Sequence, residues 1–284
     1  MALKDKEKEE TLMLISRNNY NHPFKTIITT KKVDFYKAIK ENNSLVSNDE
    51  IGILYYPVPA EIPEDFLKSF RDNLEVYSVF ALNSIDGAFY EISNFPMRSM
   101  ILKYNAITQI IGFLGAQRVE VVSTNIKTGE SSFSLNLGLD KNKSADNKTN
   151  AEKVEKSSKI DANLEYEFLE NFRKSIQIRC EFMKRNPNIE KAKEIAKRSN
   201  LLDDPIIADF IESAGLYKSK EIVIDLYSEA KKTISGGLKV SLFGKTIAKK
   251  ATELLLGTRG EFYFNFVQKS SEIDKVLVKL KVEF

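Results

Sequence analysis

Residues 132–139 read SFSLNLGL and residues 160–168 read IDANLEYEF. Apolar and polar side chains alternate in both stretches, and the apolar positions are Phe133, Leu135, Leu137, Leu139, Leu164 and Tyr166. Alternation with period two is typical of a β-strand that buries one face. We therefore expect two strands that form one long amphipathic hairpin, within an antiparallel sheet.

The segment between these strands, residues 140–159, reads DKNKSADNKTNAEKVEKSSK. It has no aromatic residue, and Val154 is its one β-branched apolar residue. Such a segment cannot bury enough apolar surface to offset the entropy that it loses on ordering. We expect a mobile loop at the tip of the hairpin.

The first 95 residues show a regular alternation of element types. Strands are expected at residues 24–29, 51–56, 75–82 and 88–92, and helices at residues 33–40 and from Pro63 to about residue 73. The order β-α-β-α-β-β predicts a sheet with helices packed on it. We interpret residues 1–95 as a small α/β unit.

Residues 96–284 read as helices combined with an antiparallel sheet. Helices are expected at 97–114, 172–184, from 186 to 198, from 204 to 214 and at 247–256, and further strands at 118–125, 221–227, 238–242, 261–267 and 276–284. The last two strands are expected to form a C-terminal hairpin that joins the sheet. The fold class is therefore mixed α+β, with either two units divided near residue 95 or one continuous domain.

Charge and composition narrow the classes of function. The chain has 43 basic and 40 acidic residues, a formal net charge of +3. A balance this even gives no general attraction to nucleic acid or to anionic lipid. A local basic face remains at the helix after residue 244, formed by Lys245, Lys249 and Lys250. Because no aromatic-rich RNA-binding signature accompanies it, binding to nucleic acid is the weaker hypothesis.

The location of the protein is predicted from its cysteine and its N-terminus. Cys180 is the one cysteine, so no intrachain disulfide forms, which fits a reducing compartment. No uninterrupted apolar run of signal-peptide length follows the charged N-terminus. We expect a cytoplasmic protein.

Catalytic and metal-binding motifs are weak. Zinc sites take several histidine or cysteine ligands, and the chain has only His22 and Cys180. Residues 239–246 resemble a phosphate-binding loop, but Lys239 replaces its first glycine. Asp225 and the sequence from Glu229 to Lys231 match the residue types of a nuclease site, but they lie within one element. We expect no metal or cofactor, and we favour a protein that is not an enzyme.

The favoured hypothesis is a non-enzymatic interaction or structural protein that acts as an oligomer or as a subunit of an assembly, with a protein partner or a second copy. A charged helix at residues 4–17 and the strand at residues 276–284 are its expected docking elements. A membrane-acting effector is the alternative, because an alternating hairpin with a polar tip resembles the inserting part of a β-barrel pore former. An enzyme or a nucleic-acid-binding protein without a recognisable motif is the third hypothesis.

Overall fold

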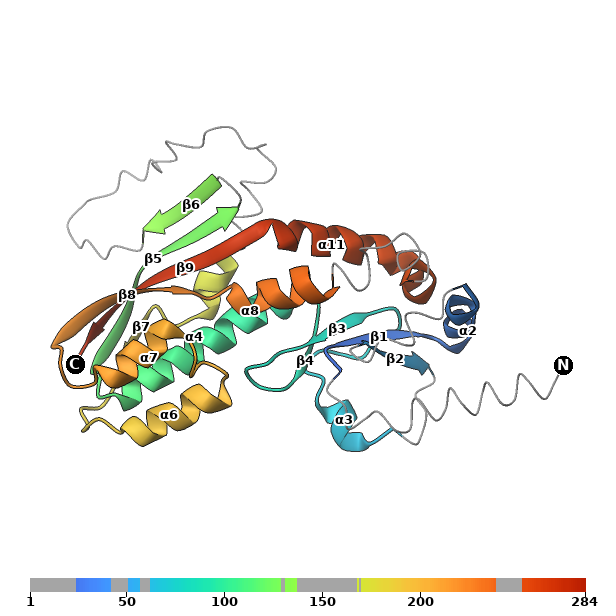
Figure 1. Ribbon diagram of the computed structural model, residues 1–284. Coiled ribbons are helices and arrows are strands. Elements are labelled where there is room, and N and C mark those ends of the chain that lie inside the picture. The colour runs from blue at the N-terminus through green and yellow to red at the C-terminus, as the bar shows by residue number, and fades with distance from the viewer. Residues whose placement is uncertain are drawn as a thin grey trace. The chain divides into compact units, whose positions relative to one another are not determined.

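The computed structural model describes residues 24–41, 51–56, 62–128, 131–136, 168, 170–238 and 252–284. These residues form helices and two β-sheets, which confirms the predicted α+β class (Figure 1). The chain divides into two compact units. Unit 1 comprises residues 1–83, 87–95 and 233–269, and unit 2 comprises residues 84–86, 96–232 and 270–284. Unit 1 therefore combines N-terminal residues with a segment from late in the chain.

The sheet of unit 1 has four strands in the order β2-β1-β3-β4. They are β1 (Thr26–Lys31), β2 (Ile51–Tyr56), β3 (Val79–Leu82) and β4 (Phe89–Glu91), and the helices α2 (Lys32–Glu41) and α3 (Glu64–Lys68) accompany them. β1 pairs with β2 in parallel and with β3 antiparallel, and β3 pairs with β4 antiparallel. The predicted order β-α-β-α-β-β is confirmed.

Two boundaries in unit 1 differ from the prediction. Helix α3 ends at Lys68, five residues early, and β3 begins at Val79 instead of residue 75. Tyr77 explains the late start of β3, because its backbone has a φ of 66° and therefore cannot be part of an extended strand. The hydroxyl of Tyr77 donates a hydrogen bond of 2.8 Å to Asp34 of α2, and this bond holds the pKa of the Asp34 carboxyl below its ordinary value.

Aromatic side chains fill one side of this sheet. Ile27, Leu54, Ile62, Phe80 and Phe89 form the buried cluster, and Phe24, Phe66, Leu67, Phe70, Leu74 and Leu82 pack against it. The ring of Phe70 stacks on that of Phe89 at 5.0 Å and meets that of Phe80 edge-on at 5.1 Å. Such offset and edge-to-face pairs stabilise a core beyond the area that they bury.

The late segment of unit 1 is helical. It contains most of the π-helix η2 (Lys232–Leu238), a helical turn at residues 252–256, η3 (Gly257–Arg259) and most of α11 (Gly260–Glu272). The predicted strand at 261–267 is therefore wrong, and so is the C-terminal hairpin. Tyr263 and Val267 are buried four residues apart while Phe262 is half exposed, which is helical spacing. Leu238, expected in a strand at 238–242, lies in η2, and residues 239–242 lie outside the described residues.

Arg259 and Tyr263 fasten this segment to the sheet of unit 1. The guanidinium of Arg259 lies 3.0 Å from both the Glu75 carboxylate and the Ser78 hydroxyl, and 3.3 Å from the Glu91 carboxylate. The buried hydroxyl of Tyr263 donates to the same Glu91 carboxylate. Burial, reinforced by Glu91, raises the pKa of Tyr263 well above its ordinary value, so its hydroxyl remains a donor at neutral pH.

We predict that Tyr263→Phe lowers the free energy of unfolding by about 2 kcal/mol, because a hydrogen bond to a charged group is lost inside the fold. Urea unfolding followed by circular dichroism measures this change. The control is Tyr217→Phe, at a ring that is 46% exposed, and it should change stability by less than about 0.5 kcal/mol. Equal stability of the two variants would contradict the role given to Tyr263.

The sheet of unit 2 is antiparallel and has the order β6-β5-β9-β8, with β7 pairing at one end of β5. Its strands are β5 (Arg118–Thr128), β6 (Ser131–Asn136), β7 (Arg179–Glu181), β8 (Ser219–Asp225) and β9 (Ile273–Glu283). The C-terminal strand β9 lies between β5 and β8 and pairs with both. It is an interior strand, so the prediction that residues 276–284 offer a docking edge is wrong.

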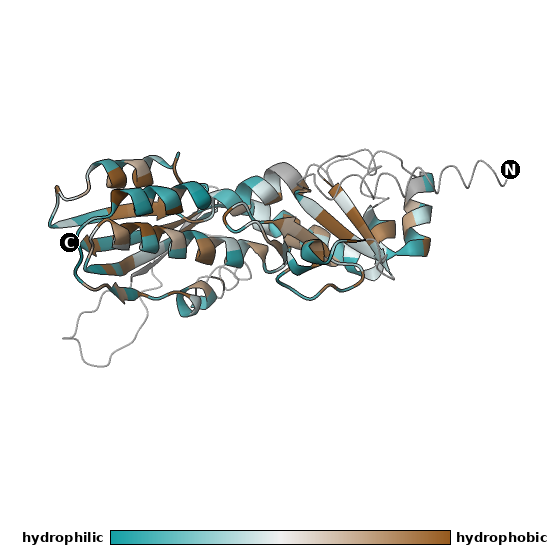
Figure 2. Ribbon diagram, turned by 90° about the horizontal axis from the view of Figure 1, so that it is seen from below, coloured by the Kyte–Doolittle hydropathy of each residue, from teal (hydrophilic) through white to brown (hydrophobic). Residues whose placement is uncertain are grey.

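Helices cover one face of this sheet. They are α4 (Phe95–Phe113), α6 (Ile189–Arg198) and α7 (Pro205–Glu212), and the short α8 (Ser228–Lys231) follows β8. Figure 2 looks onto these helices, which lie in front of the strands near the C-terminal label. Alternate residues of β9 are buried, namely Val276, Val278, Leu280 and Val282. The residues between them are half-buried or exposed, as in an antiparallel sheet with one solvated face.

Local signals define the ends of these helices as predicted. The Asp204 carboxylate accepts the backbone N–H of Ile206 at the start of α7, and Pro205 occupies the first turn. Gly115, with a φ of 95°, follows the end of α4, where a side chain would be strained.

The helix expected at residues 172–184 is correct only at its start. Residues 170–175 are helical, but Arg179–Glu181 form β7, which pairs with residues 118–120 of β5. Cys180 therefore lies in a strand and not in a helix, although it is buried as expected. Pairing with a strand about sixty residues earlier decides the structure here, and it overrides the mixed local pattern.

The hairpin expected at residues 132–168 is only partly described. β6 exists and pairs with β5, so that Phe133 lies opposite Ile126 and Leu135 opposite Thr124. The predicted partner strand at 160–168 lies outside the described residues except for Phe168, which is helical. Residues 140–159 also lie outside them. Insertion of this hairpin into a membrane therefore stays a prediction.

Candidate functional site

The outer edge of β8 is the most distinctive surface of unit 2. Hydrogen bonds at both ends of β8 show which of its backbone groups face β9. The N–H of Leu226 donates to the carbonyl of Val276, and the N–H of Phe284 donates to the carbonyl of Lys218, both at 2.9 Å. On the β8 side, both bonds use even-numbered residues, Lys218 and Leu226, which flank the strand. The register between them has no bulge.

In an antiparallel pair, residues alternate between those bonded to the neighbouring strand and those whose backbone groups point away from it. The even residues of β8 therefore bond to β9. The N–H and C=O groups of Ser219, Glu221 and Val223 point away from it. In the described part of the chain, no strand pairs with this side of β8. We call these outward groups the free edge of β8 (Figure 1).

A buried lysine ends this edge. The carbonyl of Asp225 would also point outward, but it accepts a hydrogen bond of 2.8 Å from the ammonium of Lys103 on α4. The carboxylate of Asp225 turns inward and accepts the backbone N–H groups of Tyr227 and Val276, at 3.0 and 3.3 Å. The part of β8 that can accept another strand therefore runs from Ser219 to Val223, with the N–H of Asp225 at its end.

Exposed apolar side chains lie on and beside this edge. Val223 is 48% exposed, and Leu216 and Tyr217, just before β8, are 75% and 46% exposed. The remaining exposed large apolar residues among the described residues of unit 2 are Met183, Ile189 and Leu202. Exposed apolar residues that gather at one place often mark a binding surface.

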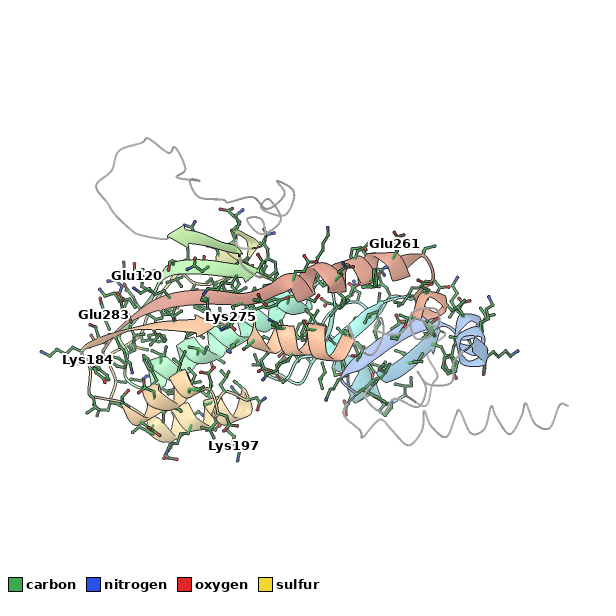
Figure 3. The ribbon with its side chains drawn as sticks, turned by 45° about the horizontal axis from the view of Figure 1, so that its top comes forward. Glu120, Lys184, Lys197, Glu261, Lys275 and Glu283 are labelled. Atoms are coloured by element: carbon green, nitrogen blue, oxygen red, sulfur yellow. The ribbon has the colours of Figure 1, made fainter. Side chains whose placement is uncertain are left out.

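Ion pairs line the sheet face that carries the side chains of these edge residues. Glu221 of β8 pairs with Lys279 of β9 at 2.6 Å, and this hydrogen bond holds the pKa of the Glu221 carboxyl below its ordinary value. Figure 3 shows Glu120, Lys275 and Glu283 along β5 and β9 in the same sheet. The negative charge at the free edge is thus already balanced within one molecule.

Lys103 itself lies almost completely buried, with 3% of its surface exposed. Its ammonium donates to the carbonyl of Asp225 and to the hydroxyl of Ser228 (2.9 Å), and it lies 3.5 Å from the carboxylate of Asp204. A buried charge needs such partners, because its loss of hydration costs several kcal/mol. One side chain of α4 thus fixes the end of β8, the first residue of α8 and the cap of α7.

Lys103→Met is expected to lower the free energy of unfolding by about 3 kcal/mol, because it leaves these three acceptors without their donor. Chemical unfolding measures the change. Lys197→Met, on the exposed face of α6, is the matched control and should be near neutral. A loss below about 1 kcal/mol for Lys103→Met would show that the network is not structural.

A pocket of about 580 Å³ lies between α4 and β7. It is lined by Tyr104, Asn105, Thr108, Gln109, Gln177, Arg179, Cys180, Glu181 and Phe182. Its one oppositely charged pair, Arg179 and Glu181, forms an ion pair between these two residues. The Cys180 thiol lies 3.3 Å from the side-chain oxygen of Gln177, and burial raises the pKa of this thiol. Apart from this ion pair and the ring of Phe182, the walls carry neutral polar side chains, and they show no nucleophile beside a base.

We predict that Cys180 reacts with a disulfide reagent at pH 8 about tenfold or more slowly than the same thiol in the urea-unfolded chain, since little thiolate forms in the fold. The rate of the folded protein should continue to rise above pH 9. Absorbance of the released thiolate measures both rates. A folded-state rate equal to the unfolded-state rate would contradict the buried, neutral thiol.

Most residues singled out from the sequence lie outside the described residues: Leu137, Leu139, Leu164, Tyr166, Lys245, Lys249 and Lys250, together with His22 and the segment 239–246. The nuclease-like residues have partners that explain them structurally. Lys231 pairs with Asp274 at 2.6 Å and Glu229 with Lys232 at 3.1 Å. Within the described ranges, no cluster of three or more histidine, cysteine, aspartate or glutamate residues could hold a metal ion. Nor does any helix there have the length and apolar character needed to cross a membrane.

Sequence reasoning identified β8 as a strand but missed its free edge. The sequence signal for an edge strand was present in residues 219–225, which read SKEIVID. This stretch contains an apolar run and no proline. Comparison with known proteins found no matching family model, curated protein or solved structure.

Proposed function

We propose that this protein is a non-enzymatic interaction subunit that binds an extended segment of a partner as an added strand along β8. The observation that carries the proposal is the free edge of β8, with outward backbone groups at Ser219, Glu221 and Val223 beside exposed Leu216 and Tyr217. Main-chain hydrogen bonds give such strand addition its affinity, and side-chain contacts give it specificity. The single cysteine supports a cytoplasmic setting for this assembly.

The arrangement around the edge leaves it open to an added strand. Natural edge strands avoid uncontrolled pairing with charges, prolines, bulges or short length. β8 has seven residues, no proline and no bulge against β9. Its carboxylates have partners within the molecule, namely Lys279 for Glu221 and two backbone N–H groups for Asp225. A partner strand therefore does not have to desolvate an unpaired charge at this edge.

Val223→Pro tests the proposal. The N–H of Val223 points away from β9, so proline removes an outward donor and leaves the β8–β9 hydrogen bonds in place. Affinity capture with the tagged protein from its own cells, read by mass spectrometry, should lose at least about 90% of any stoichiometric partner, the equivalent of about 1.4 kcal/mol.

The matched control is Val33→Pro. Val33 is 56% exposed in the first turn of α2, where proline removes no intrahelical hydrogen bond. This variant should retain the partner, and the circular dichroism spectra of both variants should match that of the native protein. A partner that both variants retain would show that β8 is not the docking strand. A native protein that captures nothing and also remains monomeric at high micromolar concentration would contradict the interaction role.

A further inference from the structure

We propose that the strand added to β8 is β8 of a second copy of this chain, so that two sheets join edge to edge around a two-fold axis through Ile222. This inference rests on the proposed function and names its partner. A two-fold axis makes the same surface of both copies meet, and antiparallel pairing of identical strands satisfies this symmetry.

The backbone pattern restricts the registers that two β8 strands can adopt. Outward groups lie on odd residues, so only registers that place odd residues opposite odd residues form hydrogen bonds. The axis must then pass through a residue and not between two residues. An axis at Ile222, the middle of β8 (Ser219–Asp225), pairs the full length of both strands. In that register Glu221 lies opposite Val223 of the other copy, and Ser219 lies opposite Asp225.

Charge selects the same register. An axis at Glu221 would place two glutamates directly opposite each other, and an axis at Val223 would place Glu221 opposite Asp225. Like charges directly opposite destabilise a sheet. With the axis at Ile222 no like charges lie directly opposite, and each exposed Val223 is covered by the aliphatic stem of a Glu221 whose carboxylate is held by Lys279.

The other face of the joined strands is also compatible. There Ile222, which is buried under the helices of its own unit, lies opposite Ile222 of the second copy, and Lys220 lies opposite Ile224. Lys220 is already paired with Asp209 of α7, and its ammonium lies over the rings of Phe210 and Tyr217. No charge on this face needs a partner from the other copy.

Lys103 sets the ends of the joined segment. Since its ammonium occupies the carbonyl of Asp225, the terminal pair forms through the N–H of Asp225 and the carbonyl of Ser219. The interface is a short strand pair with small apolar flanks. Interfaces of this size belong to the weak, transient class, so we expect dissociation in the micromolar range.

Sedimentation of the purified full-length protein from about 1 to 500 μM tests dimer formation, a range chosen around that affinity. The native protein and Val33→Pro should pass from monomer to dimer, and Val223→Pro should remain monomeric throughout. A native protein that is monomeric at every concentration would overturn the inference, as would a Val223→Pro variant that dimerises like the native protein.

Disulfide formation tests the register. In a Cys180→Ala background, Glu221→Cys and Val223→Cys are made as separate proteins. The proposed register places these two positions in a hydrogen-bonded pair with a Cα separation of about 5.5 Å, which suits a disulfide. Residue 221 of one copy and residue 221 of the other are diagonal neighbours, about 7–8 Å apart, and so are the two copies of residue 223. That separation does not suit a disulfide. Oxidation should therefore cross-link a mixture of the two proteins and neither protein alone.

The outcomes separate this inference from the proposed function. Cross-linking of Val223→Cys alone, or no cross-link in the mixture, would overturn the register and the self-pairing that it describes. If the native protein is monomeric but captures another protein in a manner that Val223→Pro abolishes, the second-copy inference fails and the interaction role of β8 stands. If it dimerises independently of β8 and captures no other protein that Val223→Pro loses, both fail.

Discussion

The arrangement of unit 2 depends on one buried charge, the ammonium of Lys103. It projects from α4 and joins the carbonyl that ends β8, the first residue of α8 and the carboxylate that caps α7. A lysine that is 3% exposed must satisfy its donors within the protein, so these three elements cannot move apart without leaving a charge unpaired. The same contact ends the free edge of β8 at Asp225. A structural contact thereby sets the length of the surface to which we assign function.

The position of β9 explains why β8 is free. β9 has eleven residues and pairs on one side with β5 and on the other with β8, so it is an interior strand of the sheet. β7 and β6 occupy the far side of β5 in turn. Among the described strands, this order leaves β8 as the outer strand, with no strand on its other side. A sheet built in this way can extend by one strand without repacking its helical face.

Local periodicity predicted the elements whose patterns are strong, and long-range pairing decided the others. The proline and acidic cap at Asp204-Pro205, the glycine at Gly115 and the alternation of residues 276–284 gave correct elements. The aromatic-rich residues 261–267 alternate in sequence but bury Tyr263 and Val267 at helical spacing, so their β propensity was misleading. β7 is only three residues long and exists because β5 offers an edge to it. No local signal shows that residues 273–283 lie between 118–128 and 219–225, and the free edge of β8 follows from that order alone.

Amide hydrogen exchange of β8, resolved residue by residue by NMR, tests most directly whether this strand has a free docking edge. In dilute protein, the amides of Lys220, Ile222 and Ile224 should be protected, because they donate hydrogen bonds to β9. The amides of Glu221 and Val223 should exchange at least about a hundredfold faster, because they have no hydrogen-bond acceptor in the described part of the fold. At the concentration where the assembly forms, Glu221 and Val223 should become protected as well. Uniform protection of all five amides in the dilute protein would mean that this side of β8 is already covered, and it would contradict the account.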